Sequence, residues 1–121
     1  MSNVHMVVGL IVVVLFLVNF IMYLLNFVQG KEVPYHRLVA FGAGGLLLIQ
    51  YLLGFSLLGE GKRITWVHVV IALIAILPVG AEHMLTAQET GMRRRGMIGM
   101  MATIITFVLV LIAYGIGEAS T

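Results

Sequence analysis

The chain has 121 residues, of which 61% are hydrophobic and only 10% are charged. A soluble domain is nearer half apolar and a quarter charged, so this composition excludes an ordinary soluble enzyme and indicates an integral membrane protein. The net charge of +2 is too small to indicate a nucleic-acid partner. The absence of cysteine excludes disulfides and thiolate metal sites.

Four apolar stretches follow one another, at about residues 4–28, 35–58, 65–85 and 96–116. Each has the roughly 20 residues that a helix needs to cross a bilayer, and none shows the alternation of a membrane β-strand. Because lipid offers the backbone no hydrogen-bond partners, we expect helices. The predicted fold class is therefore all-α: an integral membrane, up-down four-helix bundle that spans the lipid bilayer and forms one domain over residues 1–121.

The basic residues predict the orientation. Five of the seven lie in or beside the first and third connections: Lys31, Arg37, Arg93, Arg94 and Arg95. Lys62 and Arg63 lie in the second connection. The positive-inside rule then places the first and third connections in the cytoplasm and both termini outside. The predicted location is the inner (cytoplasmic) membrane of a bacterium.

Small residues mark one face of the fourth stretch, at alternating spacings of three and four: Gly96, Gly99, Thr103, Thr106, Val110, Ala113 and Gly117. Small residues at this spacing let helices approach closely in lipid, so we expect a packed face. Pro78 and Gly80 predict a bend in the third stretch near its cytoplasmic end. Glu82 and His83 follow near the inner end of that stretch, where partial hydration or hydrogen bonding is expected to be cheap.

The four histidines sort into two pairs on different helices. His5 and His68 begin the first and third stretches on the predicted outer side, whereas His36 begins the second stretch and His83 ends the third on the inner side. Neutral imidazoles on facing helices are what bis-histidine haem ligation requires. We therefore predict haem-iron sites at His5 with His68 and at His36 with His83. Simple hydration at the membrane interface remains an alternative for His5 and His36.

Several short motifs carry a resemblance to a known family. They are His36-Arg37, then Gln50-Tyr51-Leu52-Leu53-Gly54, then His68 and Ala72. The order resembles the HR, Q-x-x-LG and H-x-x-x-A signature in the four-helix halves of haem A synthase and, more loosely, cytochrome b561-type bundles. The resemblance implies a haem-holding bundle in which His36 and His68 are haem ligands or haem neighbours.

Three functions are compatible with these features. The first is a small membrane b-type cytochrome or haem-binding subunit, which binds haem b and carries electrons to a quinone or a larger membrane redox complex. In this reading, His36 and Gln50 could also hydrogen-bond a quinone head group. The second is a cofactor-free accessory subunit of a respiratory or photosynthetic complex. The third is a small transporter that works as a homodimer.

The predicted orientation is testable by cysteine labelling. Cysteine introduced at Ser2 or Ser120 should react with a membrane-impermeant thiol reagent in intact cells, because both termini are predicted to face outward. Cysteine introduced next to Arg94 should react only after lysis. The reverse pattern would contradict the orientation.

Overall fold

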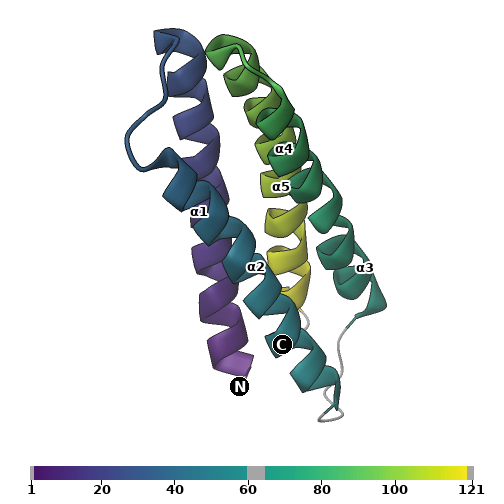
Figure 1. Ribbon diagram of the computed structural model, residues 1–121. Coiled ribbons are helices and arrows are strands. Elements are labelled where there is room, and N and C mark those ends of the chain that lie inside the picture. Colours follow the sequence, from purple (N-terminus) through teal and green to yellow (C-terminus); the bar gives the residue numbers. More distant parts are fainter. Residues whose placement is uncertain (1, 60–64, 120–121) are drawn as a thin grey trace.

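The computed structural model describes residues 2–59 and 65–119, and these residues form helices joined by short connections (Figure 1). The five helical segments are α1 Ser2–Gln29, α2 His36–Gly59, α3 Trp66–Ile74, α4 Ile76–Gln88 and α5 Met92–Ala119. The described part of the chain contains no strand, which confirms the all-α prediction for those residues. Most of the predicted connection with Lys62 and Arg63 lies outside the described residues.

Four helical spans are long and apolar enough to cross a membrane: Asn3–Gln29, His36–Gly59, Trp66–Gln88 and Met92–Gly117. They match the four predicted stretches to within a few residues at each end. The first span contains runs of β-branched residues that are poor helix formers in water, but in lipid the need to pair every backbone group favours the helix. The structure therefore agrees with a four-helix membrane bundle.

The third span is broken at its middle, where α3 ends and α4 begins on either side of Ala75. Pro78 lies three residues beyond the break. Proline has no N–H and its ring crowds the carbonyl four residues earlier, which is that of Ile74. The span is thus interrupted one turn before the proline, at mid-span, and not near its inner end as the sequence predicts.

Helices α1 and α5 pack closely along much of their length and form the centre of the bundle, while α2 packs on α1 and the α3–α4 pair packs on α5. Phe16 of α1 and Thr103 and Thr106 of α5 are completely buried there. Each threonine hydroxyl donates to a carbonyl four residues earlier on α5, at 2.6 Å and 3.0 Å. The buried hydroxyls are thereby satisfied within their own helix.

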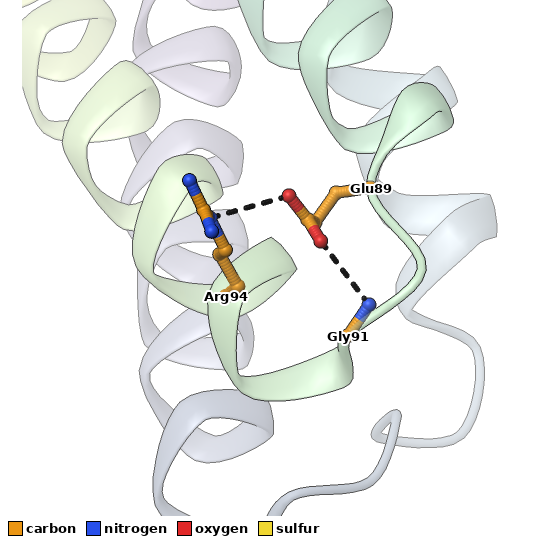
Figure 2. A network of polar contacts seen from close by, with 3 residues as sticks. All are labelled: Glu89, Gly91 and Arg94. Atoms are coloured by element: carbon orange, nitrogen blue, oxygen red, sulfur yellow. Dashed lines mark hydrogen bonds and ion pairs between the residues drawn. The ribbon is translucent and has the colours of Figure 1, made fainter.

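The two ends of the bundle differ in what they contain. The first residues of α1 and the last residues of α5 lie at one end (Figure 1), which we call the terminal end. The other end contains the α1–α2 and α4–α5 connections, and we call it the loop end. There Glu89 pairs with Arg94 Nε at 3.3 Å and accepts a hydrogen bond from the Gly91 backbone N–H at 3.3 Å (Figure 2). These contacts hold the start of α5 against the end of α4.

The predicted small-residue face of α5 is packed, as expected. A Cβ atom at Gly96 would lie 2.8 Å from the Phe27 backbone nitrogen, and one at Gly99 would overlap the Tyr23 ring. By contrast, nothing lies within 4 Å of a Cβ placed at Gly42 or Gly45 of α2. Gly96 and Gly99 of α5 therefore set the close approach to α1, whereas Gly42 and Gly45 of α2 face open space.

This packing predicts different costs for two alanine substitutions on α5. Gly99→Ala should destabilise the bundle by about 1–3 kcal/mol, because the new methyl group must displace the Tyr23 ring. Gly115→Ala is the matched control, since nothing lies within 4 Å of its Cβ position. Thermal unfolding in detergent should show a lower Tm for Gly99→Ala only. Equal Tm values for the two variants would mean that α5 does not pack on α1 through this face.

Candidate functional site

The structure brings one of the two predicted histidine pairs into ring contact. The imidazoles of His5, on α1, and His68, on α3, lie with their centroids 6.2 Å apart and their planes at 81°. The two residues are 63 positions apart in the chain, and they meet because both helices begin at the terminal end. This contact makes the terminal end the first candidate for a ligand site.

A cavity of about 140 Å³ lies beside the two rings. We call it the terminal cavity. Its walls come from α1, α2, α3 and α5, and they are mostly apolar, with Val12, Leu47 and Val110 among them. The polar side chains at its wall include His5, Gln50 and His68. An apolar cavity with a few convergent polar groups is the usual form of a small-molecule or cofactor site.

His68 is oriented by a backbone carbonyl. Its Nδ1 lies 2.6 Å from the carbonyl oxygen of Ala113 on α5. Since a carbonyl oxygen only accepts, Nδ1 carries the hydrogen and Nε2 of the neutral ring keeps a lone pair. Gly117 makes room for the ring, because a Cβ there would lie 2.9 Å from His68 Cε1. This is how histidine ligands of metals are commonly held.

Gln50 makes a hydrogen bond to the backbone of His5, but one polar atom of each side chain is left without a partner. Gln50 Nε2 donates to the His5 backbone oxygen at 2.7 Å. His5 Nδ1 and Gln50 Oε1 are both buried without a hydrogen-bond partner. A Cβ at Gly54 would lie 3.3 Å from His5 Cε1, so this glycine gives the ring its space on α2. Buried polar atoms are rarely left unpaired, so these two atoms at the cavity wall are candidates for a further contact.

At the loop end, His36 belongs to a different arrangement. Gly30 and Tyr35 both have positive φ, 71° and 67°, and they turn the chain sharply between α1 and α2. This turn places His36 at the start of α2, buried against α1. Its Nδ1 lies 2.7 Å from Asn26 Nδ2, and its Nε2 lies 2.8 Å from Asn19 Oδ1. Both ring nitrogens are therefore engaged.

The hydrogen-bond directions in this network follow from one backbone group. The Val33 N–H donates to Asn26 Oδ1 at 2.7 Å, so the Asn26 amide nitrogen must be the atom that faces His36. Asn26 then donates to Nδ1, and His36 donates from Nε2 to Asn19 Oδ1. His36 is thus a neutral imidazole in the Nε2–H form. It could bind a metal only by giving up one of these bonds.

The network continues to the buried carboxyl group of Glu82 on α4. Asn19 Nδ2 donates to Glu82 Oε2 at 3.0 Å, and the Tyr23 hydroxyl donates to the same oxygen at 2.7 Å. Glu82 is completely buried, so of the two expectations, partial hydration or hydrogen bonding, the structure shows the second. A signal was present: Asn19, Tyr23 and Asn26 follow a helical spacing of four and three, which puts three polar groups on one face of α1.

His83 lies near this network without joining it. Its ring stacks on Phe41 of α2, with centroids 4.9 Å apart and planes at 19°. His36 and His83 both line a second cavity of about 250 Å³, the loop cavity. Gln50 lines the terminal cavity instead, so His36 and Gln50 do not form one quinone-binding face. Haem ligation by His36 and His83 stays a prediction of the sequence.

Comparison with protein-family models, curated proteins and solved structures finds no match to this chain. The similarity to haem A synthase therefore stays a resemblance of motifs, and any function must be argued from the residues and their geometry.

The polar network predicts a stability difference between two asparagines of α1. Asn26→Ala should lower the stability by about 1–3 kcal/mol for each buried group left without a partner, because Val33 N–H and His36 Nδ1 both lose a bond. Asn3→Ala, at an exposed position of the same helix, is the matched control and should be close to neutral. Chemical or thermal unfolding in detergent measures both, and an Asn26→Ala variant as stable as wild type would contradict the network.

Proposed function

We propose that this chain is a small b-type cytochrome of the membrane, in which His5 and His68 are the axial ligands of one haem b. The proposal includes an up-down bundle with both termini outside, which puts the haem in the outer half of the bilayer. Its role would be to carry electrons within the membrane. The observation that carries the proposal is the perpendicular pair of imidazoles at the wall of the terminal cavity.

The spacing of the two rings suits a shared metal ion. A metal–imidazole bond is about 2.0–2.1 Å long, so two nitrogens on opposite sides of one ion lie about 4 Å apart. Each ring centre lies about 1 Å beyond its nitrogen, which gives a separation of about 6 Å between centroids. The centroids of His5 and His68 are 6.2 Å apart. Nε2 of His68 keeps its lone pair, since Nδ1 donates to Ala113.

The surroundings of the pair also suit a haem. The terminal cavity is walled mainly by apolar side chains, which match the porphyrin and exclude water. His5 Nδ1 and Gln50 Oε1, the two unpartnered atoms, could pair with each other once His5 bound a metal through Nε2. The Nδ1–H of each histidine would then be hydrogen-bonded, as second-shell partners of metal ligands usually are.

A porphyrin needs more room than the terminal cavity encloses. Cavities that enclose a ligand of that size have volumes of roughly 300–1,000 Å³, against about 140 Å³ here. The helices that would have to separate are α2 and α3, which are joined by a hydrogen bond from the Tyr51 hydroxyl to the Ala72 carbonyl. The proposal therefore requires this contact to open when haem binds.

The electron-transfer partner is proposed from the same arrangement. The described connections between helices are short, so the donor and acceptor must approach from the membrane or dock on the ends of the bundle. A quinone or a larger membrane redox complex meets this requirement. A haem bound between His5 and His68 would lie at the terminal end, so its partner should approach that end.

The haem proposal is tested by absorption spectroscopy. Wild-type protein purified gently from a haem-producing host should show a Soret band and reduced-minus-oxidised bands of a b-type haem. His68→Ala and His5→Ala should each abolish these bands, because either change removes an axial ligand. His83→Ala is the control and should keep them, since His83 lies in the loop cavity.

Two outcomes would contradict the haem proposal. A wild-type protein without haem would end it and favour the cofactor-free accessory subunit. Loss of the bands in His83→Ala but not in His68→Ala would move the haem to the loop end.

A further inference from the structure

The carboxyl group of Glu82 is buried deep in the loop half of the bundle and belongs to no part of the proposed haem site. Glu82 lies on α4, six residues before the helix ends at Gln88, which is about 9 Å along a helix axis. The residue is 0% exposed. A carboxyl group in such a place needs a specific reason, because polar groups within a membrane are costly.

The hydrogen bonds to this carboxyl group are unequal. Oε2 accepts two bonds, from Asn19 Nδ2 at 3.0 Å and from the Tyr23 hydroxyl at 2.7 Å. Oε1 is buried and has no partner. In a carboxylate both oxygens carry charge and both need donors. In a carboxylic acid the carbonyl oxygen accepts, as Oε2 does here, and the atom left without a partner is a neutral hydroxyl, which is less costly to bury than a charged oxygen.

The charged groups around Glu82 do not neutralise it. The ion pair found among the described residues joins Arg94 to Glu89. In that part of the chain no cationic side chain pairs with Glu82. Tyr23 and Asn19 of α1 face it as neutral donors. His36 of α2 reaches it only through Asn19 and is itself neutral. A buried charge without a partner is far more costly than a buried neutral acid.

The remaining titratable neighbours lie toward the loop cavity. His83 follows Glu82 on α4, and its ring stacks on Phe41. Arg95 of α5 and Glu32 of the α1–α2 connection line the loop cavity together with Tyr23. Tyr23 therefore touches both the cavity and the carboxyl group. A proton that enters the loop cavity is then separated from the Glu82 carboxyl group by the Tyr23 side chain.

We propose that Glu82 is a proton-binding site of this protein, occupied at neutral pH, with the proton on Oε1 and with Oε2 as the carbonyl oxygen. The loop cavity is the side from which the proton exchanges. This site is independent of the proposed haem, because it uses other residues at the opposite end of the bundle.

A proton fits this site better than a metal cation does. A hard cation would need several oxygen ligands. Asn19 Oδ1 already accepts from His36, the Tyr23 hydroxyl donates to Glu82 Oε2, and the Thr86 hydroxyl donates to the backbone carbonyl of Glu82. Among the described residues, no group of three or more His, Cys, Asp or Glu side chains could hold a metal ion. A single proton on Oε1 removes the negative charge without a set of oxygen ligands.

Infrared spectroscopy of the purified full-length protein in lipid tests this proposal. At neutral pH the wild type should show the carbonyl stretch of a protonated carboxylic acid. That band should disappear in Glu82→Gln and persist in the control Glu89→Gln, whose carboxylate is paired with Arg94. Loss of carboxylate bands in Glu82→Gln, with no loss of a carboxylic acid band, would overturn the proposal.

A second variant keeps the test decisive if Glu82→Gln does not fold. Tyr23→Phe removes one of the two hydrogen bonds to Oε2, so the carbonyl band should remain and shift to higher frequency. An unshifted band, or no such band in the wild type, would overturn the proposal. The haem content of each sample is read separately from its Soret band, so failure of the haem proposal and failure of the proton site are distinguishable.

Discussion

The constraint on which this structure depends is that hydrocarbon offers no partner to a polar group. Every backbone N–H and C=O within the membrane must therefore be paired inside the protein, which allows helices and forbids irregular segments exposed to lipid. The same constraint governs the side chains. Thr103 and Thr106 donate to their own helix, and the asparagines of α1 bond to His36 and Glu82. Among the described residues, buried side-chain atoms of His5, Gln50 and Glu82 lack a partner, and the proposed haem and proton sites are built on these atoms.

The close packing of α1 on α5 determines where the two ends of the bundle can differ. At the loop end, Gly96 and Gly99 allow α5 to meet the backbone of α1 near Tyr23. At the terminal end, larger side chains such as His5 and Tyr114 line a cavity. Each end thus contains a cavity, and the two cavities differ in their walls: Tyr23, Asn26 and His36 line the one at the loop end, whereas His5 and His68 line the one at the terminal end. The break at Ala75 separates α3, which bears His68, from α4, which bears Glu82.

The histidines at the two ends differ in the hydrogen bonds that their ring nitrogens make. His36 has both nitrogens bonded by asparagine side chains, so it acts as a fixed link between α1 and α2. His68 has one nitrogen bonded to a carbonyl and keeps a lone pair on the other. Both side chains are imidazoles, but their hydrogen-bond partners decide which of them has a ring nitrogen available to bind a metal. For this reason the proposed haem site uses the terminal end and the proposed proton site uses the loop end.

Much of the fold could be read from the sequence, because membrane helices need only length, apolar composition and short connections. The four spans, the packed face of α5 and the presence of a break near Pro78 all follow from local patterns. The pairing of His5 with His68 also followed, since residues that begin odd-numbered spans share one end of a bundle. The role of His36 and the burial of Glu82 could not be read in this way. They depend on side chains of α1, α2 and α4 that meet only when the helices rotate into register, and an apolar sequence does not specify that rotation.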